Sequence, residues 1–261
     1  MNKMPIGIID VSVDGLYILN PLTKDFKNED FIYINDIKNF PYEGKDVDVI
    51  NKYVKANIDR LINLNVKMLI VISDTIVEYC NEYLQTLKIP VINIVQSIIK
   101  YTNENYEQKN IVFCAKSYIL KANLYQKFIN YNHLYNVSSD ELESIIIENK
   151  LKTSKAFSVS ESTFKVVSKK DCDVLVITSP WIELLKIEIS EFLDVDEMIK
   201  LGEVVANEIR KLNLGTNSRG KGKITIVSNI DKKEFKSMTK WFNLKYKYLE
   251  ESKLDGKNKE V

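Results

Sequence analysis

The sequence is poor in the residues that carry the commonest metal and thiol chemistry. It has three cysteines (Cys80, Cys114 and Cys172) with no Cys-X-X-Cys spacing, and a single histidine, His133. These counts exclude a disulfide framework and an ordinary zinc site, so no bound metal is expected. Each cysteine is most simply a buried apolar residue. Only Cys114, at the carboxyl end of a predicted strand, merits a test as a reactive thiol.

An excess of one charge and long apolar runs are also missing. Lysine and arginine total 37 against 36 acidic residues, so no global field draws the chain to nucleic acid or a membrane. Arg60, Arg210 and Arg219 are the only arginines, which leaves few candidates for a bidentate clamp on a carboxylate or phosphate. The longest apolar runs, such as residues 68–72, are far shorter than the roughly 20 residues of a membrane span. The N-terminal ten residues lack a signal-peptide pattern, and we expect a cytoplasmic protein with no membrane association.

Short β-rich runs alternate with longer helical patterns through most of the chain. Strands are predicted at 5–10, 31–36, 67–73, 90–95, 110–115, 172–179, 223–229 and 244–250, the last as an edge strand. Helices are predicted at 47–65, about 76–87, about 117–131 and 232–242, with a helix or turn near 139–151. This alternation predicts an α/β fold with mostly parallel sheets and helices on both faces.

Two stretches of the chain resemble each other. Residues 66–75 (VKMLIVISDT) and 172–181 (CDVLVITSPW) are both buried strands that end in serine and precede a helix. We therefore expect two pseudosymmetric α/β lobes with a ligand cleft between them, the alternative being a chance likeness of parallel strands. The expected boundaries are 1–97 with 211–250 for the first lobe, 98–210 for the second, and a disordered tail at 251–261.

The motifs follow the order found in one enzyme family. Residues 6–16 (IGIIDVSVDGL) form a strand ending in aspartate and a glycine-containing turn, and residues 33–45 (YINDIKNFPYEGK) hold an aspartate and a Pro-Tyr turn. Ser-Asp-Thr at 73–75, Thr-Ser-Pro-Trp at 178–181 and the closing segment 224–242 follow. In this order and spacing the chain resembles glutamate racemase, which makes D-glutamate for peptidoglycan. The resemblance covers nearly the whole chain and implies a cofactor-independent fold of two α/β lobes.

The departures from the family pattern affect its chemistry. The two catalytic cysteines of the family correspond to Ser73 and Ser179, and its activating histidine corresponds to Trp181. In the family one thiolate removes the α-proton and the opposite thiol returns one, a task suited to a group of pKa about 8.5 that its surroundings can lower. A serine hydroxyl is far more basic and needs a neighbouring base. His133 falls outside every motif, and a second acidic helper would fall near Glu148. The resemblance therefore implies that this mechanism is lost.

The positions that correspond to the family's substrate-binding groups also differ. Hydroxyl or amide donors of the family are replaced at Val11, Asp74, Ala115, Tyr118 and Pro180. The family residues are kept at Asp10, Pro41, Tyr42 and Thr75. Carboxylates expected near the cleft are Asp10, Asp14, Asp36, Glu43 and Asp74. An unpaired buried anion facing a dicarboxylate is penalised by several kcal/mol, so tight binding of glutamate is not expected.

Several of these site residues allow two interpretations. Ser73 and Ser179 are either new nucleophiles or small replacements for a thiol; Ser73 and the two residues after it also suit helix capping, and we favour that interpretation. Trp181 either stacks on a ligand or fills the vacated cavity, and we favour the second. Asp10 is either a general base for another substrate or a brace for the first turn, and the sequence does not separate these.

Three functions follow, in order of preference. The first is a pseudoenzyme with a binding, regulatory or structural role. The second is an enzyme of altered chemistry in which Asp10, Ser73 or Cys114 acts on a neutral or cationic substrate. The third is a glutamate racemase that works by an unfamiliar route. The basic stretch 218–236 lacks interleaved aromatics, so nucleic acid is not expected as a partner, whereas a small molecule and a homodimer stay open.

Overall fold

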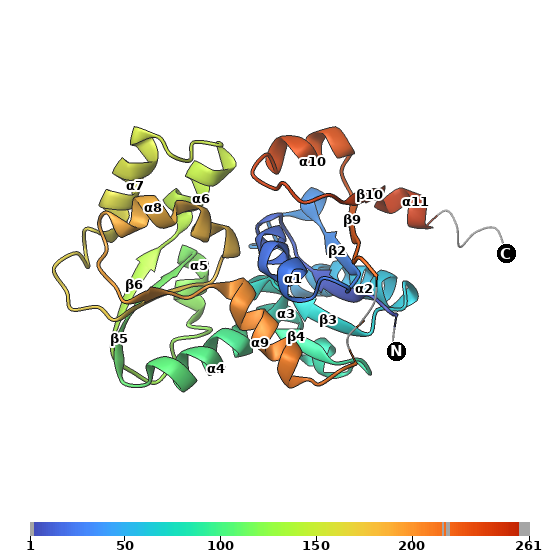
Figure 1. The fold of residues 1–261 in the computed structure, drawn as a ribbon, viewed down its shortest axis with the longest axis horizontal. Helices are drawn as coiled ribbons and strands as arrows, with labels where there is room; N and C mark the ends of the chain where they lie inside the picture. Colours follow the sequence, from blue (N-terminus) through green and yellow to red (C-terminus); the bar gives the residue numbers. More distant parts are fainter. Residues whose placement is uncertain (1–2, 216, 218–219, 256–261) are drawn as a thin grey trace. The chain divides into compact units, whose positions relative to one another are not determined.

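The computed structural model describes residues 3–215, 217 and 220–255 (Figure 1). They form two compact units: one contains the residues up to Ile94 and those from Val205 onward, and the other spans Val95–Val204. Helices α4 (Ile94–Tyr106) and α9 (Leu201–Lys211) pass from one unit into the other. No helix in the described part of the chain has the length and apolarity needed to cross a membrane.

The first unit is built on a six-stranded sheet in the order β10-β9-β2-β1-β3-β4. The strands are β1 (Ile6–Ile9), β2 (Phe31–Asn35), β3 (Met68–Val71), β4 (Val91–Asn93), β9 (Ile224–Ser228) and β10 (Lys247–Glu250). All neighbouring strands are parallel, and β10 is the edge strand that the sequence predicts. Strands β1 and β3 are buried along their whole length, as expected for central strands of a parallel sheet.

Helical segments connect these strands. They are η1 (Asp14–Ile18), α1 (Leu19–Asp25), η2 (Ile37–Asn39), α2 (Val47–Asn63), α3 (Asp74–Gln85), α10 (Lys232–Met238) and α11 (Glu251–Asp255). The carboxylate of Asp46 caps α2 by accepting the Asp48 N–H at 2.8 Å, and α2 packs on β1, β2 and α3. Residues 251–255 of the expected disordered tail form helix α11, so the prediction is wrong for them. Residues 256–261 of that tail lie outside the described residues.

The second unit contains a four-stranded parallel sheet in the order β6-β5-β7-β8. Its strands are β5 (Lys109–Ala115), β6 (Tyr131–Ser138), β7 (Val174–Ile177) and β8 (Glu197–Met198). Its helical segments are α5 (Ser117–Ala122), α6 (Asp140–Ile147), α7 (Ser154–Phe164), η3 (Pro180–Leu185) and α8 (Lys186–Ser190). Helix α7 packs against both α6 and α8.

The helix predicted over residues 117–131 is correct only over its first six residues, which form α5. Helix α5 ends at Ala122 because Asn123 adopts the left-handed conformation, with φ of 54°, and its N–H bonds the Leu120 carbonyl. The chain then forms β6, an edge strand whose residues are mostly exposed or half-buried and largely polar. No strand is predicted over residues 131–138 because these largely polar residues lack the apolar run by which buried strands are recognised.

The two units share one strand topology. The order β2-β1-β3-β4 of the first sheet recurs as β6-β5-β7-β8 in the second, and the first sheet adds β9 and β10 beyond β2. Val71 of β3 pairs with Ile9 of β1, and Ile177 of β7 pairs with Cys114 of β5. The fold class predicted from the sequence, two similar parallel α/β units, is confirmed.

Candidate functional site

The candidate site residues gather at the carboxyl edges of the two sheets. After β1, β2 and β3 of the first sheet come Asp10, Val11, Pro41, Tyr42, Ser73, Asp74 and Thr75. After β7 of the second sheet come Ser179, Pro180 and Trp181. Because the strands within each sheet are parallel, their carboxyl ends meet at one edge, where open α/β sheets bind ligands.

The Asp10 carboxylate accepts four hydrogen bonds, and only 2% of the residue's surface is exposed. Its Oδ1 accepts the backbone N–H groups of Val11 at 2.7 Å and Ser12 at 3.3 Å. Its Oδ2 accepts the Gly15 N–H at 3.0 Å and the Tyr33 hydroxyl at 2.5 Å. The carboxylate therefore fixes the turn between β1 and η1, as the bracing interpretation predicts.

Gly15 is required at the start of η1 because the backbone passes so close to Asp10. A Cβ atom on Gly15 would lie 2.6 Å from Oδ2 of Asp10 and 2.4 Å from Cγ2 of Ile72. Both distances are well inside van der Waals contact, so no larger residue fits without moving the turn. The glycine in IGIIDVSVDGL thus serves the packing around Asp10.

Burial gives Asp10 an unusual proton affinity. Desolvation, and after it the nearby charge of Asp14, raise the pKa of its carboxyl to about 7, although the hydrogen bonds from Tyr33, Ser12 and Gly15 oppose this shift. Burial and the negative charge of Asp10 in turn hold the pKa of Tyr33 well above its usual range. A carboxyl group with this pKa can take up or release a proton near neutral pH, which a general base requires. Bracing and proton transfer are thus compatible roles for Asp10.

Asp36 forms a second, separate network after β2. Its carboxylate accepts the Tyr42 hydroxyl at 2.6 Å, the Asn39 amide at 2.8 Å and the Asn229 amide at 2.5 Å. Asp36 and Tyr42 are both buried, whereas Pro41, which follows a cis peptide bond, is exposed. Asp36, like Asp10, is held by neutral donors within the first unit. Each of the two acids is thus a structural component of the turn that it begins, directly after a strand.

Ser73 caps helix α3. Its hydroxyl accepts the Ile76 N–H at 3.4 Å, and only 7% of the residue is exposed. This contact is the helix cap that the sequence suggests for Ser73, and it explains why α3 begins at Asp74, two residues earlier than predicted. Asp74 is half-buried and Thr75 is buried in the first helical turn.

Ser179 occupies the equivalent position in the second unit but has different surroundings. Its side chain makes no capping hydrogen bond to η3, whose first residue is Pro180. Proline lacks an N–H and suits the first position of a helix. Ser179 is 6% exposed and Trp181 is buried. The capping role found for Ser73 therefore does not extend to Ser179.

The cysteines and the histidine lie in places unsuited to proton transfer from a substrate. All three thiols are buried, and burial raises the pKa of Cys80 to about 11 and that of Cys114 much further. Burial also raises the pKa of Cys172, which precedes β7. His133 is exposed on β6, with Nδ1 3.1 Å from Oδ1 of Asn110. Cys114 is therefore no longer a candidate for a reactive thiol.

Glu148, the position nearest to the family's second acidic helper, is an exposed residue after α6. It pairs with Lys150 and, at 2.9 Å, with Lys155. The hydrogen bonds of Lys150 and then Lys155 lower the pKa of its carboxyl to about 2. A carboxylate of this kind is a poor general acid near neutral pH.

Sequence reasoning missed a polar cluster at the carboxyl ends of β5 and β6. The Ser117 hydroxyl lies 3.0 Å from that of Ser138 and bonds the Asp140 carboxylate. Beside it, Ser139 donates to Glu143 at 2.9 Å, and Lys116 lies 3.2 Å from Glu143. Ser-Ser-Asp directly after a strand would have indicated this cluster, but β6 itself was not predicted. No three or more acidic, cysteine or histidine side chains among the described residues are grouped to hold a metal ion.

Known proteins share the fold of this chain. No family model matches the chain. It is similar to solved glutamate racemases of Bacillus anthracis (isoform RacE1; TM-score 0.83, 19% identity, 95% of this chain and 97% of that chain) and Thermus thermophilus (in complex with β-chloro-D-alanine; TM-score 0.83, 18% identity, 95% and 96%). An aspartate racemase homologue of Pyrococcus horikoshii shares the fold at a TM-score of 0.58, with 14% identity, 81% of this chain and 99% of that chain. The chain thus has the two-sheet fold of these solved racemases.

The curated proteins that are similar in sequence include glutamate racemases. The glutamate racemase of Clostridium novyi is 25% identical over 248 residues, which cover 93% of this chain and 92% of the relative. That of Staphylococcus haemolyticus is 26% identical over 219 residues, or 81% and 82% of the two chains. The chain is therefore similar to glutamate racemases in sequence over most of its length, as its motifs indicate.

Proposed function

We propose that this glutamate-racemase-like protein is a pseudoenzyme that has lost proton transfer at Cα and has a binding, regulatory or structural role in the cytoplasm. The observation that supports the proposal most directly is the state of Ser73. Its hydroxyl accepts the Ile76 N–H of α3, and this is its only hydrogen-bonding partner among the described residues. That contact supplies no base that could remove the hydroxyl proton.

Racemisation at Cα needs an acid and a base that exchange roles in each turnover. A serine hydroxyl without an adjacent base remains protonated near neutral pH and does not remove a Cα proton. In the second unit, Ser179 is followed by Pro180 and Trp181, and neither of these carries a basic side-chain nitrogen. The two serines thus occupy the thiol positions implied by the resemblance without supplying the chemistry.

The test is proton NMR of L-glutamate and of D-glutamate in D₂O with the purified protein, following loss of the α-proton signal. We expect no exchange above a protein-free sample, while the glutamate racemase of Bacillus anthracis run in parallel exchanges the signal. Exchange that disappears in Ser73→Ala or Ser179→Ala would refute the proposal. It would favour an atypical glutamate racemase that supplies D-glutamate for peptidoglycan.

One observation favours the alternative of an enzyme with altered chemistry. Asp10 lies at the carboxyl end of β1 with a pKa near 7, a value suited to a general base. This alternative requires a substrate other than a dianion. Alanine, serine and lysine of both configurations can be tested in the same NMR assay. Exchange on one of them that is lost in Asp10→Asn would support it.

A further inference from the structure

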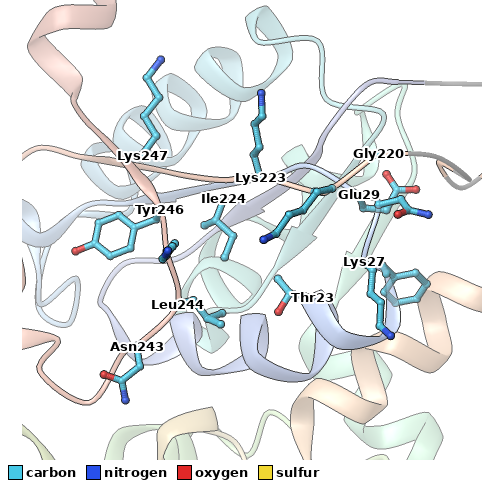
Figure 2. A pocket seen from close by; sticks show the side chains of 15 residues that line it. Thr23, Lys27, Glu29, Gly220, Lys223, Ile224, Asn243, Leu244, Tyr246 and Lys247 are labelled. Carbon is cyan, nitrogen blue, oxygen red and sulfur yellow. The ribbon is translucent and has the colours of Figure 1, made fainter.

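A pocket of about 980 Å³ lies in the first unit, at the edge of the sheet away from the candidate site. Its lining comes from the residues that lead into three neighbouring strands: 26–29 before β2, 220–224 at the start of β9, and 243–247 at the start of β10 (Figure 2). Because these strands are parallel, their amino ends share one edge. We call this pocket the lysine groove.

Buried contacts hold one wall of the groove in place. Glu29 and Lys67 form an almost fully buried ion pair of 2.7 Å. Glu29 also accepts the backbone N–H of Asn217 at 2.7 Å and its side-chain amide at 3.1 Å. Gly222 bonds the Lys27 carbonyl at 2.8 Å, and a Cβ atom at Gly222 would lie 2.1 Å from the Glu29 carbonyl oxygen. The segment that carries the basic residues is thus fixed against the start of β2.

The groove is strongly basic. Five lysines line it: Lys27, Lys221, Lys223, Lys245 and Lys247. All five are exposed, and none forms an ion pair with a carboxylate of the described residues. Glu29 is the one acidic residue of the described lining, and Lys67 already neutralises it. The described lining therefore carries five lysines that form no ion pair there, beside Asp30, whose carboxylate accepts the Lys223 N–H at 2.7 Å. The net charge of the whole chain is +1.

The interior of the groove is apolar. Its wall and floor include Phe26, Ile224, Leu244 and Tyr246. Figure 2 shows the side chains of Ile224, Leu244 and Thr23 directed toward one another, while Lys223 and Lys247 point together to the other side of their strands. The charges thus lie on both sides of the strands that line the pocket, and an extended anion fits them better than one compact phosphate does.

We propose that the lysine groove binds an acidic segment of a partner protein, with apolar side chains on the floor and carboxylates against the lysines. Two features favour a polypeptide over a nucleic acid. The floor is aliphatic as well as aromatic, whereas single-stranded nucleic acid requires flat rings on which bases can stack. Strand β10, which follows the groove, has β9 as its one strand partner in the described chain, so an extended peptide can continue along its open edge.

The proposal can be tested by fluorescence anisotropy with the full chain. The probe is a fluorescein-labelled twelve-residue peptide of glutamate with two leucines, and a second probe replaces both leucines by serine. We expect saturable binding of the first probe, at least tenfold weaker binding of the second, and weakening with added salt. In the double variant Lys221→Glu, Lys245→Glu, binding of the first probe should fall at least tenfold.

A matched variant controls for net charge. Lys52→Glu with Lys88→Glu makes the same change at two exposed lysines of the first unit that lie outside the groove, and it should leave the affinity within twofold. Three results would overturn the proposal: no saturable binding of the peptide, equal losses in the two double variants, or a labelled single-stranded oligonucleotide that binds more tightly than the peptide. Circular dichroism of both variants verifies that they fold.

Discussion

Replacing Asp10 by asparagine should change the pH dependence of stability in a way that reveals the proton on this carboxyl group. The amide oxygen can still accept the N–H groups of Val11 and Ser12, as Oδ1 does. The amide NH₂ would face the Gly15 N–H, a donor that now bonds Oδ2. Leaving this buried donor without an acceptor costs about 1–3 kcal/mol, so the variant should be less stable than the wild type by this amount at pH 5.

The sign of the pH effect follows from the raised pKa of Asp10. The folded value is about 7, while an unfolded aspartate titrates near its ordinary value of 3.8. Between these values the folded protein holds a proton that the unfolded chain has released. The free energy of unfolding therefore falls as the pH rises from about 4 to 7, by up to about 1.4 kcal/mol per pH unit. Asparagine does not titrate, so the difference between wild type and variant should shrink toward pH 7.

Urea unfolding at pH 5, 6, 7 and 8, followed by circular dichroism, measures this difference. Glu183 serves as a control because burial also raises the pKa of its carboxyl to about 7, and it lies in the second unit. Its variant, Glu183→Gln, should lose a separate part of the pH dependence. Wild-type and Asp10→Asn curves that run parallel across this range would refute the raised pKa of Asp10.

Further substitutions at Gly15, Ser73 and Lys67 test the packing around the candidate site and the groove. Gly15→Ala should destabilise the protein by about 1–3 kcal/mol in urea unfolding, because its Cβ would overlap Asp10; an unchanged midpoint would contradict this. Ser73→Ala should cost about 1 kcal/mol through the lost helix cap, and Ser73→Asp should retain most of the stability. Lys67→Met should cost about 3–5 kcal/mol because Glu29 stays buried without its cation, whereas the double variant with Glu29→Gln should recover part of the loss; no recovery would count against the ion pair as the cause.

Central strands were predictable from the sequence, and edge strands only in part. β1, β3 and β7 are continuous apolar runs because parallel strands inside a sheet are covered on both faces. β10 alternates clearly and is predicted as a strand, whereas no element is predicted over the polar strand β6, of which only Tyr131 falls within the predicted helix 117–131. Helix α2 lies where the sequence predicts a helix, although its apolar residues Val47 and Ile62 are exposed. The burial of a residue at the margin of a helix face depends on packing that the period alone does not determine.

The sequence predicts which turns carry the candidate site residues, but it does not predict most of the hydrogen bonds between them. A serine between a strand and a helix carries its own capping signal, and Ser73 makes that contact. The bond from Tyr33 to Asp10 has no such signal, because a tyrosine inside an apolar strand is indistinguishable from a core residue. Asn229 lies 193 positions along the chain from Asp36, which it bonds, and only the order of strands brings them together.

The two equivalent serines differ in what their presence implies. Ser73 and Ser179 both follow the last residue of a central strand by two positions, in two sheets of the same topology. Ser73 stabilises a helix of 12 residues, and this contribution is sufficient to account for a serine there without any catalytic role. Ser179 makes no capping bond, so helix capping does not account for it. We therefore expect Ser179→Ala to reduce any residual catalytic activity more than it reduces the free energy of unfolding. Ser73→Ala, in contrast, should lower the free energy of unfolding first.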